Sequence, residues 1–405
     1  MSRAAEAPIE STYAWLRLGA SLAIGTVGGI GMWSFVIALP PVQAEFAVAR
    51  AEASLPYTFA MVGFGVGGML IGRVADRFGI LLPILGAALA LGLGYIGAGY
   101  AASVWQLALA HALIGVGSSA TFGPLIADVS HWFARRRGIA VAICSCGNYI
   151  AGTVWPPLVQ HFIETAGWRH THIGIGVLCA AIILPLALVL RRRAPTGHHH
   201  AQGIAATAAQ DALGLSPGAL QALLAVAGLA CCAAMAMPQV HIVAYCSDLG
   251  YGAARGAEML SLMLGFGLIS RLACGVVADR VGGVAALLIS SVLQAAALLL
   301  YLGFDSLPSL YVVSALFGLF QGGLVPTYAV IVREYFPPKE AATRLGMILL
   351  GTIVGMAFGG SMSGAIFDLT GSYQAAFANG FLWNLLNMAI ALWIITRRER
   401  RAALA

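Results

Sequence analysis

The chain consists of long apolar runs separated by short breaks that are charged or rich in glycine and proline. Most runs are about 20 residues long, the length that an α-helix needs to cross the hydrocarbon core of a membrane. The pattern predicts an all-α membrane protein with twelve transmembrane helices. The predicted spans cover residues 15–40, 55–72, 81–101, 105–129, 138–160, 171–190, 218–246, 257–278, 284–303, 309–332, 345–367 and 375–396.

The composition favours a membrane protein over a soluble one. Of the 405 residues, 60% are hydrophobic and 9% are charged, whereas a soluble domain carries about 25% charged residues. This small number of charges cannot cover the surface of a soluble protein of this size. We therefore expect lipid to surround much of the protein surface. The net charge of +6 follows from basic connections between the spans and does not require a nucleic-acid partner.

The basic residues indicate the orientation in the membrane. If the N-terminus is cytoplasmic, the cytoplasmic connections hold most of the lysines and arginines, and the outside connections hold only Arg50, Arg169 and Arg255. This is the positive-inside distribution. We therefore expect a multi-pass protein of the cell (inner) membrane with both termini in the cytoplasm. The first apolar run is too long for a cleavable signal peptide.

One charged turn occurs twice along the chain. The segments Gly72–Gly79 and Gly275–Gly282 both read G-x-V-A-D-R-x-G, at an offset of 203 residues. The same offset relates Trp132-Phe133 to Tyr335-Phe336, and Gly115 to Gly318. Several matches at one offset indicate an internal duplication.

The duplication predicts two six-helix bundles. We expect them to cover residues 1–190 and 217–405, with a cytoplasmic linker over 191–216. The linker contains His198-His199-His200, which we interpret as a solvated tract rather than a metal site. The seven cysteines lie in or at the ends of apolar runs, where they are expected to be small packing residues and not a disulfide framework.

The predicted spans, the duplication and the G-x-x-x-D-R-x-G turn resemble the major facilitator superfamily of transporters. In that superfamily, the acid and the arginine of this turn form a cytoplasmic latch that stabilises the outward-open state. The resemblance implies this role for Asp76, Arg77, Asp279 and Arg280.

Further motifs are similar to the monocarboxylate transporter and oxalate/formate exchanger branch of that superfamily. They are an aromatic pair followed by arginines at 132–138, Gly167-Trp168-Arg169, the stretch from Phe367 to Tyr373, and an arginine in the eighth span. The resemblance implies that the substrate is a small carboxylate and that this arginine binds it.

Arg271 is that arginine. It lies eight residues before Asp279, or about 12 Å along a helix, and so near the middle of a hydrocarbon core about 30 Å thick. A charge at this depth costs at least about 2.5–3.5 kcal/mol. No acid lies within a helical turn of it on its own span, and the acids of other spans lie near span ends. This favours a ligand over a buried ion pair, because a guanidinium can hold a carboxylate with two parallel hydrogen bonds.

The number of fixed charges separates two classes of substrate. In the resembled oxalate exchanger, a second basic residue in the eleventh span binds the second carboxylate; Thr352 stands there in this chain. Mammalian monocarboxylate transporters carry an acid where Gly267 stands and a lysine in the first span, which is absent between Trp33 and Pro40. One cation favours a monocarboxylate. The missing acid and lysine leave the residues of proton coupling open.

Other polar residues at middle depth are candidates to complete the site. A hydrogen bond between helices is the more frequent role of each such residue. The substrate-binding candidates beside Arg271 are Asn148, Gln321, Ser118 and Tyr328. His241 and His111 are candidates for proton coupling because imidazole titrates near neutral pH, although a packing histidine fits either position equally well.

These features predict a secondary active transporter that moves a small monocarboxylate, such as lactate or pyruvate, together with a proton by alternating access. It is expected to work as a monomer without a cofactor. An organic anion exchanger of the oxalate/formate type is the alternative, and a non-transporting receptor with the same fold is a more distant one. Cation efflux is disfavoured because no acid lies at mid-depth, and an enzyme is disfavoured because no catalytic motif is present.

Overall fold

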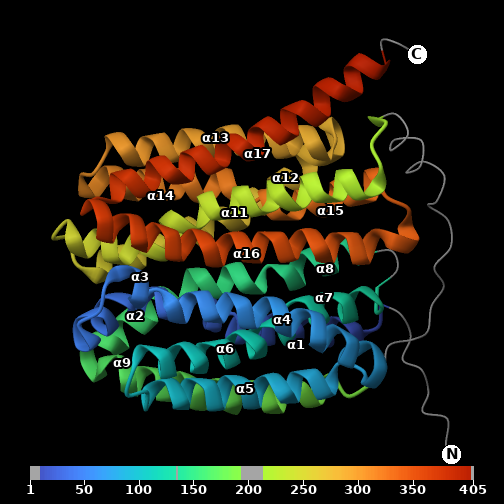
Figure 1. Ribbon diagram of the computed structural model, residues 1–405. Coiled ribbons are helices and arrows are strands. Elements are labelled where there is room, and N and C mark those ends of the chain that lie inside the picture. The colour runs from blue at the N-terminus through green and yellow to red at the C-terminus, as the bar shows by residue number, and fades with distance from the viewer. Residues whose placement is uncertain (1–9, 134–135, 193–212, 403–405) are drawn as a thin grey trace, which may run out of the picture. The chain divides into compact units, whose positions relative to one another are not determined.

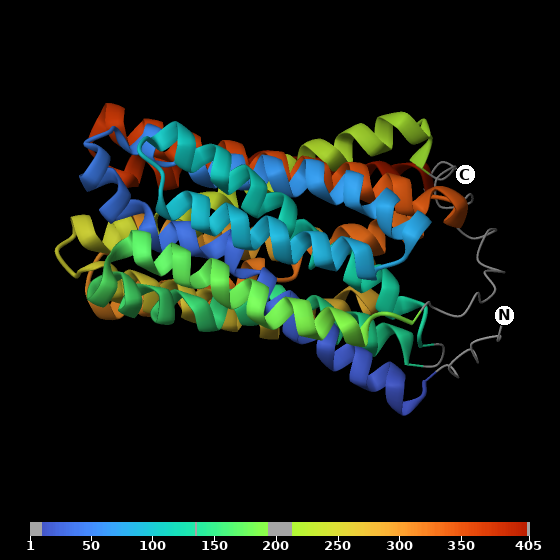
Figure 2. The same ribbon diagram turned by 90° about the horizontal axis from the view of Figure 1, so that it is seen from below.

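The computed structural model describes residues 10–133, 136–192 and 213–402. In this part of the chain, all regular secondary structure is helical. The chain folds into two compact units, Met1–Val48 with Leu55–His199, and Ala49–Ser54 with His200–Ala405. Within each unit the long helices run alongside one another (Figures 1 and 2). The histidine tract at 198–200 lies outside the described residues.

The first unit contains most of the helices in the first half of the chain. They are α1 (Thr12–Gly28), α2 (Ile30–Phe46), α4 (Leu55–Phe78), α5 (Leu81–Gly99), α6 (Val104–Ala120), α7 (Gly123–Ser130), α8 (Arg137–Ser145) and α9 (Gly147–Val189). The second unit contains α3 (Arg50–Ala53), α11 (Pro217–Asp248), α12 (Ala253–Val281), α13 (Gly283–Gly303), α14 (Leu307–Gln321), α15 (Leu324–Tyr335), α16 (Pro338–Thr370) and α17 (Tyr373–Ala402).

Eleven helical stretches among the described residues are long and apolar enough to cross a membrane, which makes this a multi-pass membrane protein. One of them includes α9, whose 43 residues correspond to about 65 Å of helix, far more than one crossing needs. Gly167 interrupts α9 with a left-handed φ of 78°, between the predicted spans 138–160 and 171–190. If α9 crosses the membrane once on each side of this break, the chain crosses it twelve times, and this number remains a prediction.

Several predicted spans are broken helices. The spans 15–40, 105–129, 138–160 and 309–332 each consist of two helices, with breaks next to Gly29, Thr121, Cys146 and Gly322. At one break, the Thr121 hydroxyl donates to the Ser118 carbonyl at 2.8 Å, a local bond that competes with helix continuation. Hydropathy alone does not distinguish a broken span from a continuous one, since both stay apolar.

The internal duplication extends to helix packing. A Cβ atom built on Gly115 of α6 would lie 2.0 Å from the Ala60 carbonyl oxygen of α4. Its counterpart at offset 203, Gly318 of α14, would meet the carbonyl oxygen of Met263 in α12 at 1.9 Å. Gly318 and Met263 each lie 203 positions after Gly115 and Ala60, so the two units share this backbone contact. It requires glycine, because any side chain would force the helices apart.

The last glycine of the repeated turn has a conformational reason to be glycine. Gly79 and Gly282 have φ values of 82° and 86°, a region that side chains with a Cβ rarely adopt. Each follows the end of a long helix, α4 or α12. The repeated motif therefore encodes the same left-handed helix end in both units.

Candidate functional site

Arg271 lies on α12, ten residues before its last residue, Val281. It belongs to the apolar stretch Ala253–Ala278, and its side chain is half-buried. The end of α14 packs on this part of α12. A Cβ on Gly322 would lie 2.3 Å from the Gly267 carbonyl oxygen, and the N–H of Gly323 donates to Ser270 Oγ at 3.1 Å. The break between α14 and α15 therefore lies against the turns of α12 that flank Arg271.

Gln321 is the last residue of α14 and lies at this break. Its side chain is 0% exposed, and neither its amide oxygen nor its amide nitrogen has a hydrogen-bond partner among the described residues. A buried polar group without a partner costs about 1–3 kcal/mol. The fold thus keeps the unsatisfied amide of Gln321 in the same part of the second unit as Arg271. Of the candidates proposed beside Arg271, Gln321 is the one that the structure associates with it most clearly.

Tyr328 of α15 belongs to a different group of contacts. It is 0% exposed, and its hydroxyl donates to Asn387 Oδ1 of α17 at 3.4 Å. The amide of Asn387 in turn donates to Ser291 Oγ of α13 at 2.7 Å. Tyr328 therefore joins three helices of the second unit by hydrogen bonds, the packing role that the sequence left open for it.

The candidates of the first unit also hold helices together. Ser118 of α6 is 1% exposed and donates to the Gly28 carbonyl of α1 at 2.9 Å. Asn148 of α9 accepts a hydrogen bond on Oδ1 from the Trp33 indole of α2 at 3.3 Å. Asn148 is half-buried, so part of its amide stays accessible.

His111 lies in the core of the first unit. It is 0% exposed, and its Nδ1 is 2.9 Å from the Leu107 carbonyl oxygen. Its ring lies edge-on to His172, with 5.7 Å between ring centroids. His172 is equally buried and was not among the residues that the sequence suggested, because nothing in the local pattern sets it apart from other histidines of the spans.

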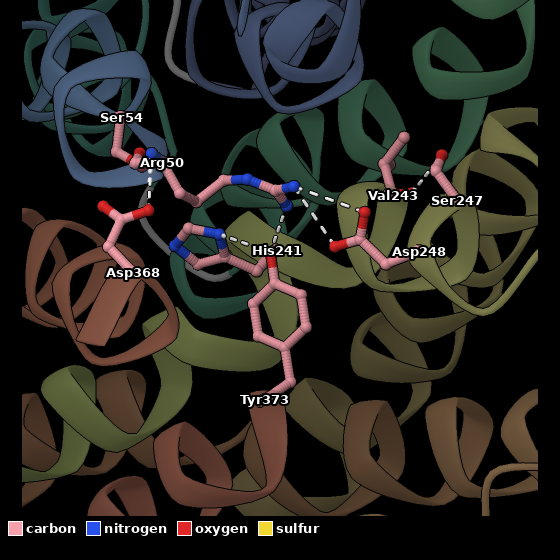
Figure 3. A network of polar contacts seen from close by, with 8 residues as sticks. All are labelled: Arg50, Ser54, His241, Val243, Ser247, Asp248, Asp368 and Tyr373. Atoms are coloured by element: carbon pink, nitrogen blue, oxygen red, sulfur yellow. Dashed lines mark hydrogen bonds and ion pairs between the residues drawn. The ribbon is translucent and has the colours of Figure 1, made fainter. Parts of the chain in front are cut away.

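His241 belongs to a charged cluster that the sequence did not predict, shown in Figure 3. Its centre is Arg50 of α3, which is 6% exposed. The Arg50 guanidinium forms an ion pair with Asp248 at the end of α11, with 3.1 Å between Nη2 and Oδ2, and donates to the Tyr373 hydroxyl at the start of α17. It also lies over the Phe367 ring at 4.8 Å.

The backbone of α3 is held by a second acid. The carboxylate of Asp368, near the end of α16, accepts from the N–H groups of Arg50 at 2.8 Å and Ala51 at 2.7 Å. His241 completes the cluster: its Nε2 is 2.8 Å from the Gly360 carbonyl oxygen, and its Nδ1 is 3.4 Å from the Tyr373 hydroxyl. Residues more than 300 positions apart in the chain thus meet at the end of the second unit where α11 and α16 end.

The residues of the predicted latch are described in part. The side chains of Arg77 and Arg280 are exposed, whereas those of Asp76 and Asp279 lie outside the described set. Beside the second copy of the turn, the Glu334 carboxylate accepts from the N–H of Gly283 at 2.8 Å and 3.1 Å. An acid at a helix N-terminus is stabilising, so Glu334 holds the start of α13.

A further ion pair lies in the first unit. The Arg17 guanidinium binds the Asp128 carboxylate through two hydrogen bonds, of 2.7 Å from Nε and 2.8 Å from Nη2. Arg17 is 1% exposed and also lies over the Trp132 ring at 4.7 Å. Both residues lie near the ends of predicted spans, where charged residues are frequent and do not indicate a specific partner.

Sequence comparison decides the family. The profile of the Major Facilitator Superfamily matches residues 22–285 and 248–404, nearly the whole chain. The chain belongs to the Major Facilitator Superfamily. Its fold and family are accordingly those of membrane transporters, which are not enzymes.

The relatives place the chain within the superfamily. It is 26% identical over 362 residues to bovine monocarboxylate transporter 13, covering 84% of this chain and 80% of the relative. It is 23% identical over 388 residues to human monocarboxylate transporter 11, covering 91% and 80%. The predicted resemblance to the monocarboxylate transporter branch of the superfamily is therefore confirmed.

Solved structures share the fold. A nucleoside transporter, NupG, superposes with a TM-score of 0.72 at 14% identity, covering 94% of this chain and 99% of that one. A bacterial homologue of the human lysosomal transporter Spinster, in an inward-facing and unoccupied conformation, gives 0.68 at 17% identity, covering 97% of each chain. At these identities the likeness concerns the fold.

Proposed function

We propose that this transporter moves a small monocarboxylate, of the size of lactate or pyruvate, and that Arg271 binds the carboxylate. The observation that carries the proposal is a half-buried arginine within an apolar stretch of α12 that is long enough to cross the membrane. A guanidinium in that setting favours an anion, and its two parallel N–H groups match a carboxylate. The relatives named monocarboxylate transporters support the same class of substrate.

Gln321 is the second residue proposed for the site. Its buried amide offers one acceptor and one donor group, both without partners among the described residues, and it lies at the break that packs against the turns of α12 around Arg271. A 2-hydroxy or 2-oxo acid carries an oxygen beside the carboxylate that such an amide can bind. Asn148, Ser118 and Tyr328 remain candidates, each with a packing hydrogen bond in this structure.

Transport by purified protein tests the role of Arg271. Two charge-assisted hydrogen bonds of about 1.5–3 kcal/mol each correspond to at least about a 100-fold loss of affinity on their removal. We expect Arg271→Ala to abolish uptake of labelled lactate into proteoliposomes, and Arg271→Lys, which keeps the charge, to retain weak uptake.

A matched control lies on the same helix. Arg255 of α12 is paired with Glu258 one turn away at 3.0 Å, and its side chain is 52% exposed. Arg255→Ala removes the same charge at a solvent-facing position and should leave uptake within about twofold, since exposed pairs of this kind contribute little. Wild-type lactate uptake by folded Arg271→Ala protein would refute the proposed binding role.

Coupling to protons is part of the proposal, and anion exchange is the rival mechanism. A proton symporter should accumulate lactate when the outside is acidified, with no anion inside the liposomes. An exchanger of the oxalate/formate type needs a counter-substrate inside and is indifferent to the pH gradient. Uptake measured in the four combinations of counter-substrate and pH gradient separates the two.

A further inference from the structure

Two neighbouring cysteines lie in the middle of α11. Cys231 and Cys232 are free thiols, and both are buried in an apolar stretch long enough to cross the membrane. Their sulfur atoms are 3.8 Å apart. Successive side chains on a helix diverge by about 100°, so this close approach gathers two soft donor atoms at one spot, beyond the packing role that the sequence predicted.

The spacing of the two sulfurs suits a bridging atom better than a disulfide. Disulfides usually join Cα atoms that are about 4.4–6.8 Å apart, whereas neighbouring Cα atoms of a chain are only about 3.8 Å apart. Two thiolates on a tetrahedral metal, with bonds of about 2.3 Å, lie about 3.8 Å from each other. A linear two-coordinate ion with the same bond length would hold them about 4.6 Å apart. The observed separation of 3.8 Å therefore matches tetrahedral coordination.

Oxygen-bearing side chains from three other helices of the second unit surround the thiols. The Tyr328 hydroxyl of α15 contacts the Cys231 thiol, and the Thr352 hydroxyl of α16 contacts the Cys232 thiol. From α13, the amide nitrogen of Gln294 donates to the Cys231 carbonyl at 3.4 Å. The amide oxygen of Gln294 is buried and has no hydrogen-bond partner among the described residues. An acceptor beside the thiols thus lacks a donor or a cation, which costs about 1–3 kcal/mol.

We propose that Cys231 and Cys232 form a binding site for a thiophilic divalent cation of the zinc and cadmium class. Each thiol loses its proton to solvent and bonds to the metal as a thiolate, the form that binds metals. The two thiolates balance the double positive charge, so the bound ion adds no net charge to an apolar span, where a net charge is costly. No third His, Cys, Asp or Glu ligand joins the pair in the described part of the chain. The oxygens of Gln294, Thr352 and Tyr328 are therefore the ligands that remain to complete the coordination.

Cadmium is the probe that reports on sulfur ligation directly. A cadmium–thiolate bond gives a charge-transfer absorption band in the ultraviolet, whereas cadmium bound only by carboxylates or histidines does not. Full-length protein in detergent, kept reduced with a phosphine that carries no thiol, is titrated with cadmium ions and followed by difference absorption. We expect the band to saturate at one cadmium ion per chain. Bound cadmium should also raise the thermal unfolding temperature, because a ligand that binds the folded state stabilises it by mass action.

Single variants test whether both sulfurs hold the ion. Cys231→Ser and Cys232→Ser each leave one thiolate, and the loss of the second linked ligand should weaken cadmium binding by at least about 100-fold. Cys231→Ala and Cys232→Ala repeat the test without a buried hydroxyl, and thermal unfolding without cadmium shows which variants are folded. The control is Cys144→Ser with Cys146→Ser, a second pair of closely spaced cysteines, of which Cys146 is only half-buried. This control should keep the band and the wild-type affinity.

Each other outcome overturns the proposal. No thiolate band in the folded wild-type protein rules the site out, and so does a band that appears only after unfolding in sodium dodecyl sulfate, since the fold then closes the thiols to ions. A band that survives at full affinity in folded Cys231 and Cys232 variants, or that is lost in the Cys144 and Cys146 control, assigns the cadmium to other sulfurs. The titration contains no substrate, so a failure to transport monocarboxylates would leave its result untouched.

Discussion

The contact repeated between Gly115 and Ala60 and between Gly318 and Met263 makes a quantitative prediction. A Cβ on Gly318 would lie 1.9 Å from the Met263 carbonyl oxygen, whereas ordinary contact begins at 3.4 Å. Gly318→Ala therefore requires α12 and α14 to separate locally by roughly 1.5 Å, the difference between these two distances. The obstacle is backbone, so no side chain can rotate away to relieve it.

The energetic cost follows from that displacement. Overpacking of this kind costs about 1–3 kcal/mol, and the higher helix propensity of alanine offsets at most about 1 kcal/mol of it. Gly318→Ala should therefore destabilise the protein by up to about 3 kcal/mol, or up to about 2 kcal/mol where the propensity gain is realised in full. Gly115→Ala should do the same, because its Cβ would meet the Ala60 carbonyl oxygen at 2.0 Å.

Thermal unfolding of detergent-solubilised protein measures the effect. Gly97→Ala in the first unit and Gly346→Ala in the second are matched controls, since a Cβ at either position meets no atom within 4 Å. The controls should unfold at or slightly above the wild-type temperature and the two contact variants clearly below it. Equal unfolding temperatures for Gly318→Ala and Gly346→Ala would show that the close helix approach is not needed for stability.

Two more predictions concern buried polar groups. Asp128→Ala leaves the buried Arg17 guanidinium without its acid and should destabilise the protein by about 3–5 kcal/mol. The double variant Arg17→Met with Asp128→Leu should come close to wild type, because no buried charge is then left without its partner. A double-mutant cycle of unfolding free energies checks both expectations, and equal losses in the single and double variants would contradict them. Gln321→Leu removes an unsatisfied amide and should stabilise the fold by about 1–3 kcal/mol, while lactate uptake falls. Unfolding and uptake measured on the same protein check both, and undiminished uptake would contradict the proposed substrate contact.

Part of the architecture could be predicted from local patterns. Hydropathy predicted an all-helical, multi-pass membrane protein, and the repeated turn at 72–79 and 275–282 indicated the superfamily. The breaks near Gly29, Thr121 and Gly322 were not predicted, because an interrupted helix can be as apolar as a continuous one. The short α3 was also missed, since four residues carry too little periodicity to indicate a helix.

The candidate site likewise contains one residue that the sequence indicates and others whose surroundings only the structure shows. Arg271 stands out in the sequence because a charge in a long apolar run is costly wherever it points. The environment of Gln321 was not visible, because its burial and its lack of hydrogen-bond partners depend on how α14 ends against α12. His241 was chosen for its depth and chemistry, but its partners Tyr373 and Gly360 follow only from the packing of three helices.

The sequence by itself determined that this protein crosses the membrane many times, belongs to a transporter superfamily and carries one arginine deep in an apolar helix. These properties depend on residues acting singly or over one span, since the cost of placing a residue in lipid is set by its own chemistry. Only the tertiary structure decided that Arg50 meets Asp368 across 318 positions and Tyr373 across 323. Such pairings depend on the packing of α11, α16 and α17, which no local pattern records.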